Sequence, residues 1–484
     1  MADGAAAASL LQDVRRWADR QGVEVRFGVF NPANGALVGE APDMGAPETE
    51  AAIAAAARAL PAWAALTAKA RGEILRRWHD LILSRQAELA HLLSAEQGKP
   101  LEEALAEVRF SASFIEWFAE EGKRLYGDVI PSHAAGKRLL TIKQPVGVVG
   151  AITPWNFPNG MVARKVAPAL AAGCTVVLKP AEDTPLSAIA LAVLAVEAGV
   201  PPEVFQVVTA KAPAAVAEAL TASPTVRKLS FTGSTRVGKL LLRQCADTVK
   251  KVSLELGGNA PFIVFEDADL DAAVAGAVVS KFRNAGQTCV CANRIYVHAS
   301  VMEAFAARFS DAVSRLVVGE GANPTTNVGP LINAAALAKV DGLVRDAVAK
   351  GATAVLGGAR HPRRGNFYSP TILTGVTNDM EIAHAEIFGP VAPLFTFETE
   401  EDVVRRANDT PYGLAAYYWT RDIGRAIRVG EALEYGMVGL NEGLISSEAA
   451  PFGGVKESGI GREGSKYGLE EYVEIKYLLL GGLA

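Results

Sequence analysis

The sequence predicts an α/β protein built from two lobes, each a doubly wound, mainly parallel sheet with helices on both faces. Between residues 148 and 256, short β-branched segments alternate with helical segments, which is typical of parallel strands joined by crossover helices. A second alternating region begins at Pro261 and continues to about residue 450. The chain has 484 residues, of which 50% are apolar, so both lobes can bury a core.

The elements are expected in a regular order along the chain. The first twenty residues have the pattern of a short surface helix, and helices follow at 51–66, 74–83 and 102–121. A hairpin is expected over 126–144. Strands are then expected at 148–152, 175–178, 204–208, 228–231 and 252–256, with helices between them at 159–172, 185–198, 213–220 and 235–246. The second region is expected to have a strand at 261–265, helices at 269–283 and 301–316, and a terminal strand at 472–480.

The composition excludes several classes of protein. The 48 Lys and Arg residues against 53 Asp and Glu give a net charge of −5 without a basic block, which argues against a nucleic-acid-binding surface. No stretch approaches the roughly 18 apolar residues of a membrane span, and the chain start lacks the apolar core of a signal peptide. The 4 cysteines are too few for a disulfide scaffold, and the 6 histidines show no metal-ligand spacing. We therefore expect a cytoplasmic enzyme that uses no metal and binds neither nucleic acid nor membrane.

Cys289 is the first candidate for chemistry. It lies in GQTCVCANR, a glycine-containing loop after the helix at 269–283. A loop cysteine is accessible, and backbone N–H groups around it could stabilise the thiolate, which is the nucleophilic form. The alternative is a small buried apolar residue.

Two further candidates follow strand ends. Glu255 stands at the end of a strand in SLELGGN, where parallel sheets bind ligands, and it could activate water as a general base. Asn156 in TPWNFPNG follows the strand at 148–152, and its amide could donate a hydrogen bond to an oxyanion. The alternatives are a salt-bridged Glu and an Asn that caps the next helix.

Three segments are suited to a dinucleotide. A Lys and a Glu after one strand could bond ribose hydroxyls, a strand–glycine–helix turn could bind pyrophosphate, and a loop Glu beside a Phe could hold a ribose and a flat ring. Each segment is weak evidence alone, because such turns are common. The residues are Lys179 and Glu182 in LKPAEDTP, Gly233 and Ser234 in FTGSTRVGK, and Glu386 and Phe388 in EIFGP.

Together and in this order, these motifs resemble the aldehyde dehydrogenase superfamily. The resemblance runs over nearly the whole chain, from NPANG at 31–35 to the KYLLLGG tail. It implies that Cys289 is the nucleophile, that Glu255 activates the deacylating water, and that Asn156 forms the oxyanion hole with the Cys289 N–H. It implies contacts to NAD(P) from Trp155, Lys179, Glu182, Gly233, Ser234, Leu256, Glu386 and Phe388. One departure is Ala385, where many relatives have a second acid.

The resemblance also implies a domain organisation with two Rossmann-like domains and a β oligomerisation arm. The expected NAD-binding domain comprises residues 1–125 and 145–255, and the catalytic domain comprises 256–455. The arm and C-terminal strand comprise 126–144 and 456–484. A homotetramer or homodimer is expected.

Within the superfamily, the chain resembles NAD(P)-dependent succinate-semialdehyde dehydrogenases. Arg164 and Arg283 stand where relatives acting on neutral aldehydes often have apolar or aromatic pocket residues, and Ser446 and Ser447 lie at a further pocket wall. Guanidinium groups suit the distal carboxylate of a semialdehyde, because Arg binds carboxylates in a bidentate fork. Interdomain salt bridges are the alternative for the arginines, and glutarate semialdehyde is the competing substrate.

Glu182 predicts NAD over NADP, because a 2′-phosphate beside a carboxylate adds like-charge repulsion. NADP stays as the alternative, since Lys179 can soften that repulsion, and position 182 is Ser in some NADP-using relatives. Glu255 argues against the CoA-acylating relatives, which lack this base. The intact set of candidate catalytic residues argues against a non-enzymatic structural role.

Cys291 is a candidate redox partner of Cys289. Residues i and i+2 of a straight strand lie about 6–7 Å apart, which is the upper edge of what a disulfide tolerates. The loop must therefore bend to close one, and two independent thiols are the alternative.

Overall fold

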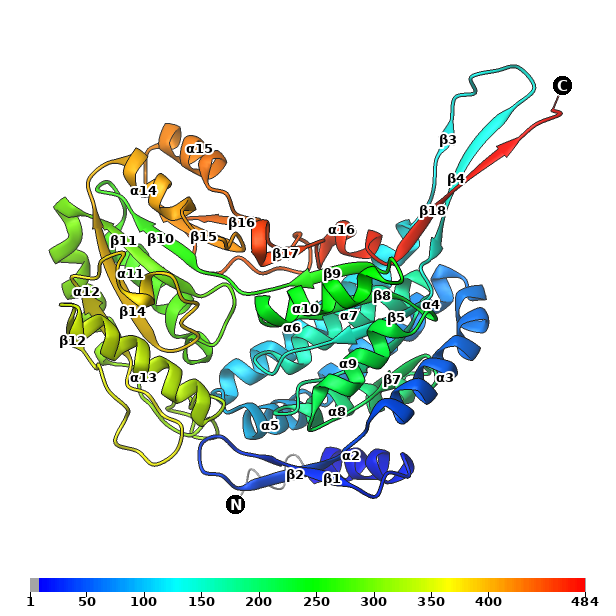
Figure 1. Ribbon diagram of the computed structural model, residues 1–484, viewed down its shortest axis with the longest axis horizontal. Helices are drawn as coiled ribbons and strands as arrows, with labels where there is room; N and C mark the ends of the chain where they lie inside the picture. Colours follow the sequence, from blue (N-terminus) through cyan, green and yellow to red (C-terminus); the bar gives the residue numbers. More distant parts are fainter. Residues whose placement is uncertain (1–7, 484) are drawn as a thin grey trace.

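The computed structural model describes residues 8–483, which form two lobes and a projecting arm (Figure 1). The chain builds a 6-stranded sheet in the first lobe, a 7-stranded sheet in the second, a 3-stranded sheet in the arm and a separate 2-stranded hairpin. The strands and helices predicted between residues 148 and 316 and the terminal strand are confirmed, with boundaries that differ by at most two residues. The strand at 292–298 and the elements between 317 and 471 were not predicted individually.

The sheet of the first lobe has the order β17-β9-β8-β5-β6-β7, in which all neighbours except β17 and β9 are parallel. Val149 and Ala151 of β5 enter one core cluster and Val148 and Ile152 the other, because successive residues of a strand point to opposite faces. The strands are β5 (Val148–Ile152), β6 (Thr175–Lys179), β7 (Phe205–Val207), β8 (Val226–Thr232), β9 (Lys251–Glu255) and β17 (Gly459–Ile460).

Helices cover both faces of this sheet. The first strand of this sheet along the chain, β5, lies in its middle: β6 and β7 follow on one side of it, and β8 and β9 on the other. The order in which strands are added therefore reverses between β5 and β8, and in such sheets ligands bind at the carboxyl ends of the strands at this point. Proline at the first turn starts several of these helices, since its missing N–H has no helical partner there. The helices are α7 (Pro158–Ala172), α8 (Pro185–Glu197), α9 (Pro213–Ala222) and α10 (Thr235–Ala246).

The sheet of the second lobe has the order β12-β13-β14-β11-β10-β15-β16 and is parallel except for β12. Its strands are β10 (Ala260–Val264), β11 (Ala292–His298), β12 (Thr353–Leu356), β13 (Thr371–Thr374), β14 (Val391–Phe397), β15 (Ala415–Trp419) and β16 (Met437–Leu440). Its helices are α11 (Leu270–Phe282), α12 (Met302–Ser314), α13 (Ala334–Ala349), α14 (Glu400–Asn408) and α15 (Ile423–Ala432). One-turn helices are η2 (Arg283–Gly286), η3 (Ala299–Val301) and η4 (Glu381–Ala383).

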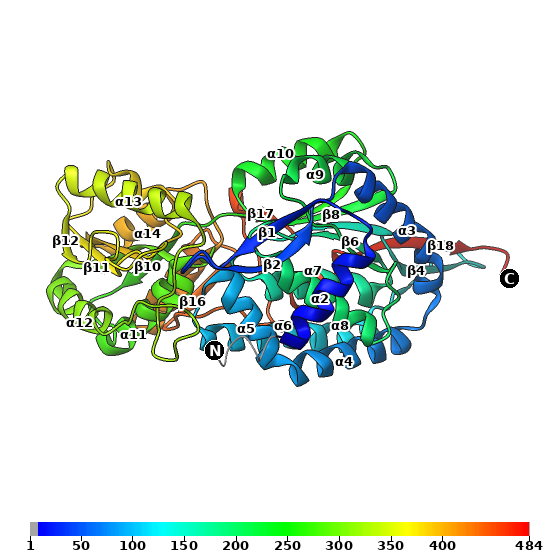
Figure 2. The same ribbon diagram turned by 90° about the horizontal axis from the view of Figure 1, so that it is seen from below.

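The N-terminal region adds a helical layer to the first lobe. Its helices are α2 (Ala8–Arg20), α3 (Ala46–Ala65), α4 (Ala68–Ser84), α5 (Gln86–Gln97), α6 (Leu101–Glu121) and η1 (Gly122–Arg124). The sequence did not predict α5 or the hairpin of β1 (Arg26–Phe30) and β2 (Leu37–Pro42). Figure 2 shows the hairpin and α2 lying across this lobe. The predicted first helix is confirmed from residue 8, and residues 1–7 lie outside the described part.

The arm consists of β3 (Val129–Ile130), β4 (Arg138–Pro145) and β18 (Val473–Leu480), as the sequence predicted. Before the chain reaches β18 it passes η5 (Lys456–Ser458), β17 and α16 (Ser465–Glu470). Since β17 pairs with β9, the start of the segment 456–484 runs along the first sheet and only its end enters the arm.

Within residues 8–483, no single helix has the length and apolar character needed to cross a membrane. The pair α3 and α4 meets these criteria only when the two are taken together, and the helices are bent by 115° at their junction.

Candidate active site

Two cavities between the lobes meet at Cys289. The Glu386 cavity has a volume of about 320 Å³, and the Arg283 cavity about 240 Å³. Cys289 and Met161 line both, so a thiol stands where the two spaces join.

The loop that carries Cys289 is held by close backbone contacts. A Cβ at Gly258 would lie 2.4 Å from the carbonyl oxygen of Cys289, so only glycine allows the two segments to approach. Burial first, and then the nearby Glu386 carboxylate, raise the pKa of the Cys289 thiol to about 12. The expected stabilisation of a thiolate by backbone N–H groups is therefore outweighed in this structure, and the thiol needs a proton acceptor to become a nucleophile.

Asn156 reaches this loop from the end of β5. Its Nδ2 donates to the carbonyl oxygen of Gln287 at 3.0 Å, and its own carbonyl oxygen accepts from Lys99 Nζ at 2.8 Å. The amide has two N–H groups, so the second is available to a ligand beside Cys289. The alternative of a helix cap is wrong, because Phe157 occupies the N-cap of α7.

Glu255 ends β9 and is 3% exposed, and neither carboxylate oxygen has a hydrogen-bond partner within the described chain. Burial, and then the charge of Glu463, raise the pKa of Glu255 well above its ordinary value. Glu463 itself lies 2.6 Å from Lys165 Nζ and 2.8 Å from Arg164 Nη2. The structure therefore contradicts the salt-bridge alternative for Glu255 and gives instead a buried carboxyl that keeps its proton to a higher pH than an ordinary Glu.

Glycine turns and aromatic rings build the Glu386 cavity. Trp155 and Phe388 meet edge to face with ring centroids 5.5 Å apart. Leu256 also lines the cavity, as do Gly233 and Ser234 at the start of α10. The Glu386 carboxylate accepts from Gly258 N at 3.0 Å. Burial raises the pKa of Glu386 to about 7, against the opposing effects of that N–H and of the Lys339 ammonium.

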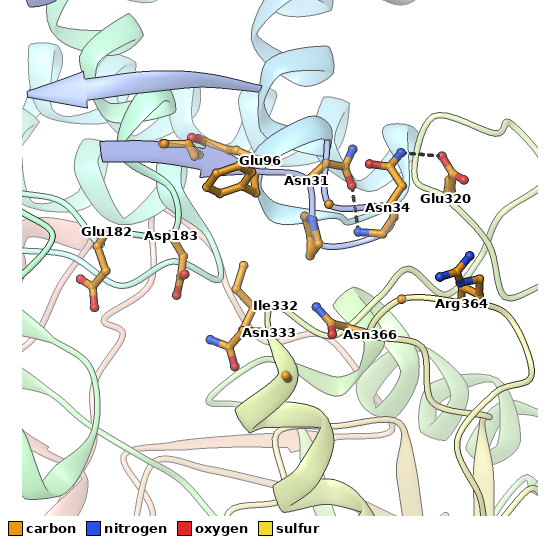
Figure 3. Close-up of a pocket in the computed structure, with 18 of the residues that line it drawn as sticks. Asn31, Asn34, Glu96, Glu182, Asp183, Glu320, Ile332, Asn333, Arg364 and Asn366 are labelled. Carbon is orange, nitrogen blue, oxygen red and sulfur yellow. Dashed lines mark hydrogen bonds between the residues drawn. The ribbon is translucent and has the colours of Figure 1, made fainter. Parts of the chain in front are cut away.

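A third and larger cavity, the Asp183 cavity, has a volume of about 840 Å³ and continues from the Glu386 cavity past Ile332 and Asn333, which line both. Figure 3 shows Glu182 and Asp183 side by side on one loop, with Asn333 near Asp183. Lys179 Nζ lies 2.9 Å from Glu182 Oε2, which brings the two predicted ribose ligands together.

The Arg283 cavity is lined by two arginines, Arg164 and Arg283, and by two glutamates, Glu103 and Glu107. The guanidinium of Arg283 lies over the Phe157 ring at 5.4 Å and has no ion-pair or hydrogen-bond partner among residues 8–483. The guanidinium of Arg164 lies 3.8 Å from the centre of the Phe452 ring. It is paired with Glu463, as the salt-bridge alternative predicted. Its Nε has no hydrogen-bond partner within the described structure. Ser446 also lines the cavity.

Two predicted residues point elsewhere. Ser447 is absent from the lining of the Arg283 cavity, and its hydroxyl accepts from Ala449 N at 3.3 Å. The buried Cys291 Sγ contacts the carbonyl oxygens of Lys281 and Ala292 at 3.6 and 3.7 Å. The described residues contain no group of three or more His, Cys, Asp or Glu side chains arranged to hold a metal ion.

The sequence model of a protein family described as "Aldehyde dehydrogenase family" matches residues 17–478 of the chain. The chain belongs to the aldehyde dehydrogenase family. It is therefore an oxidoreductase that acts on an aldehyde, and the cofactor of this family is NAD(P).

Individual aldehyde dehydrogenases are similar over almost their whole length. The chain is 61% identical over 465 residues to the succinate-semialdehyde dehydrogenase [NADP(+)] GabD of Escherichia coli, covering 96% of both chains. It is 58% identical over 455 residues to a glutarate-semialdehyde dehydrogenase of Pseudomonas aeruginosa, covering 94% of both. A crystal structure of succinate-semialdehyde dehydrogenase from Burkholderia pseudomallei matches with a TM-score of 0.94 at 59% identity, over 95% of both chains. The predicted fold class and family are confirmed.

The residues present fit NAD(P). A Cβ at Gly257 would lie 2.9 Å from Glu386 Oε2, so the glycine keeps open the space between α10 and that carboxylate. The donor and acceptor pair Lys179 and Glu182 suits ribose hydroxyls, and the start of α10 presents backbone N–H groups to a phosphate.

Sequence reasoning missed several residues of this aldehyde dehydrogenase site. Asn333 lines two cavities, and Lys339 Nζ donates to the carbonyl oxygen of Glu386 at 2.7 Å. The helix start NAAALAK could have drawn attention to both, since Asn333 caps α13. Glu463 and Asn284 carry no motif signal, because their roles depend on contacts with distant segments.

Proposed function

We propose that this aldehyde dehydrogenase oxidises succinate semialdehyde to succinate, with NAD as the preferred cofactor. The observation that carries the proposal is the unpartnered guanidinium of Arg283 in a cavity that opens on Cys289. The half-buried guanidinium forms no direct ion pair within residues 8–483, although the Glu103 carboxylate on the same cavity acts on it at longer range. A cation in that state favours a substrate that brings an anionic group. On the same cavity, Arg164 adds a second guanidinium, which is already paired with Glu463, and Ser446 adds a hydroxyl.

The proposed chemistry begins at Cys289. Its Sγ releases a proton to solvent water and attacks the aldehyde carbon as a thiolate. The second N–H of Asn156 Nδ2, with the Cys289 N–H, stabilises the oxyanion that forms. NAD(P)⁺, held by the Glu386 and Asp183 cavities, supplies the hydride acceptor when bound. The acyl group left on Cys289 is a thioester. Glu255, whose raised pKa lets it accept a proton, activates the water that releases the acid.

An assay of cofactor reduction tests the proposal. Succinate semialdehyde should be oxidised without added CoA, and with a kcat/KM far above that of butyraldehyde, which has the same carbon chain without the carboxylate. Equal efficiency for the two aldehydes would contradict a carboxylate substrate. A strict need for CoA would contradict the hydrolytic role of Glu255.

Glutarate semialdehyde is a second candidate substrate. The relative from Pseudomonas aeruginosa bears that name at 58% identity. One methylene changes pocket affinity by only about 1–3 kcal/mol, so activity on both semialdehydes is expected. Succinate semialdehyde is preferred because the 61% identical relative bears its name.

The preference for NAD rests on Glu182, whose carboxylate would accept bonds from ribose hydroxyls and repel a 2′-phosphate. The Escherichia coli relative is named for NADP(+), so the two cofactors must be compared directly. A kcat/KM for NAD at least about tenfold above that for NADP is expected, which corresponds to about 1.4 kcal/mol. Equal values would contradict the preference.

For the domains, we propose the boundaries given above, except that the start of the segment 456–484 belongs with the first sheet. We also propose a homo-oligomer, a tetramer or a dimer, assembled through the arm. Its apolar side chains are unusually exposed, among them Val129 at 78% and Ile475 at 70%. Such a surface on a sheet edge favours a second copy as its partner. A single monomeric mass in sedimentation equilibrium would contradict this.

Cys291 is proposed as a redox partner of Cys289, which requires its buried Sγ to turn away from Lys281 O. Peroxide inactivation that dithiothreitol reverses, and that Cys291→Ala alters, is expected. Identical sensitivity of both proteins would mean independent thiols.

A further inference from the structure

We infer that Asn284 is the positioning residue that sets the geometry of the oxyanion hole. It does so by tying the Asn156 segment to the Cys289 loop. The inference rests on the proposed role of Asn156 and extends it to a residue with no contact to substrate.

The backbone at Asn284 is strained. Asn284 and Ala285 have φ values of 52° and 54°, and Gly286 follows at 74°, so the chain makes a left-handed turn three residues before Cys289. Non-glycine residues rarely adopt this conformation, and Asn tolerates it better than most. Both residues are nevertheless almost fully buried. The surrounding structure must therefore hold the turn in place.

The Asn284 side chain forms the link between the two segments. Its Nδ2 donates to the carbonyl oxygen of Asn156 at 3.0 Å and to that of Gln287 at 3.2 Å. Asn156 Nδ2 donates to the same Gln287 oxygen at 3.0 Å. One N–H group of Asn284 therefore holds the Asn156 main chain, and the other holds the Gln287 oxygen that orients the Asn156 amide.

Side chains of α5, of α6 and of the turn between these helices hold this link in place. Gln97 Nε2 donates to Asn284 Oδ1 at 3.0 Å, and Glu103 Oε2 accepts from Asn284 N at 2.8 Å. Lys99 Nζ donates to the Asn156 carbonyl oxygen and is paired with Glu107. Glu107 accepts in turn from the N–H groups of Asn159 and Gly160 at the start of α7.

The consequence concerns the second N–H of Asn156. With the first fixed on Gln287, the direction of the second is determined, and it is the group proposed to meet the oxyanion. Oxyanion donors act because they are held in place before charge develops, so a loosened amide loses stabilisation of the transition state. Asn284 would then affect the rate of acylation and hydride loss without affecting cofactor binding.

The test compares Asn284→Gly with Ala285→Gly. Glycine accepts the left-handed backbone at both positions, but only the first change removes side-chain hydrogen bonds. With NAD and succinate semialdehyde, we expect Asn284→Gly to lower the rate constant of the reduced-cofactor burst about 10- to 100-fold, less than the roughly 10²–10³-fold typical of losing an oxyanion donor itself. Ala285→Gly should keep the wild-type rate constant.

Further readouts separate positioning from a general loss of structure. A merely structural role would lower the burst amplitude. Positioning lowers the rate constant and changes the primary deuterium isotope effect measured with the 1-deuterio aldehyde, because it alters the balance between thiol attack and hydride departure. The burst amplitude and the dissociation constant for NAD stay constant. In an Asn156→Ala background, Asn284→Gly should cost less than about twofold, because residues that act as a unit are not additive.

Several outcomes would overturn the inference. One is a burst rate constant in Asn284→Gly equal to that of the wild type. Another is a decrease of that rate constant in the Asn156→Ala background as large as in the wild-type background. A wild-type burst in Asn156→Ala alone would overturn the role of Asn156, and the inference with it. Should Asn284→Gly not fold, Gln97→Glu keeps the acceptor for Lys99 N and removes the donor to Asn284 Oδ1. It should lower the same rate constant severalfold, and an unchanged rate constant would overturn the inference.

Discussion

The Glu386 cavity and the Arg283 cavity share Cys289 but are built in different ways. Strand ends and glycine turns form the first, where a Cβ at Gly257 or Gly233 would lie within 3 Å of a neighbouring side chain. Long side chains from α6, α7, η2 and the 444–452 segment form the second. The backbone thus shapes the space proposed for the cofactor, whereas side chains shape the space proposed for the aldehyde.

This difference predicts which substitutions are selective. A change on the Arg283 side should alter the choice of aldehyde and leave cofactor binding intact, and a change on the Glu386 side should do the reverse. Only residues at the junction should affect both.

Cys289→Ala should abolish turnover with every aldehyde, by about 10⁴-fold or more, because no thioester can form. Steady-state cofactor reduction measures this loss, and NAD binding should persist. Cys291→Ala is the matched control two residues away, expected to retain turnover within about twofold. Steady turnover near that of the wild type in Cys289→Ala would show that Cys289 is not the nucleophile.

Glu255→Gln should lower steady-state turnover by roughly 10²–10⁴-fold, the contribution of a general base, while the first burst of reduced cofactor survives. The carboxyl has a raised pKa, so it is protonated and inactive at low pH. Wild-type kcat should therefore fall as the pH drops through this raised pKa, and the Gln variant should lose that dependence. A missing burst would place Glu255 in the first half of the reaction instead.

Arg283→Ala should reduce kcat/KM for succinate semialdehyde by tens- to thousands-fold, the equivalent of about 2–5 kcal/mol, and barely change that for butyraldehyde. Arg164→Ala should show a smaller selectivity together with a lower melting temperature, because Glu463 loses one of its two buried cations. Equal losses on charged and neutral aldehydes in both variants would make the arginines structural.

Glu182→Ser should raise the ratio of NADP to NAD efficiency about tenfold, since it removes one repulsive charge from a site where Lys179 remains. The choice among aldehydes should stay constant. The comparison of kcat/KM values for both cofactors and two aldehydes measures both effects, and Asp183→Asn on the same loop is the control.

The same contrast explains what the sequence could predict. Residues on the Glu386 side follow strand ends within short motifs, so periodicity and motif order indicated Glu255, Gly233 and Glu386 together. The strands β5 to β10 were predictable because β-branched runs alternate with helices there. The helix α5 was missed because most of it is buried, which leaves little amphipathic pattern.

The rest depends on contacts between distant segments. Glu463 meets Arg164 and Lys165 about 300 positions away, and Asn284 meets Asn156 across 128 positions. No local pattern encodes such pairings. The raised pKa of Cys289 was also unpredictable, because it comes from burial and from Glu386, which only the fold brings near.

The smallest expected effect concerns Glu386, whose pKa burial raises to about 7. A carboxyl with a raised pKa is protonated below that pKa and ionised above it. The ionised form is the better acceptor for a ribose hydroxyl, and its negative charge also attracts the cationic nicotinamide of the oxidised cofactor. The dissociation constant for NAD⁺ should therefore increase severalfold as the pH falls from 8 to 6, and fluorescence titration can measure it. Glu386→Gln cannot ionise, so its dissociation constant should be nearly constant over that range. An unchanged pH dependence in this variant would assign the titration to another group of the cofactor site, with Asp183 the next to test, because burial and Glu182 also raise its pKa.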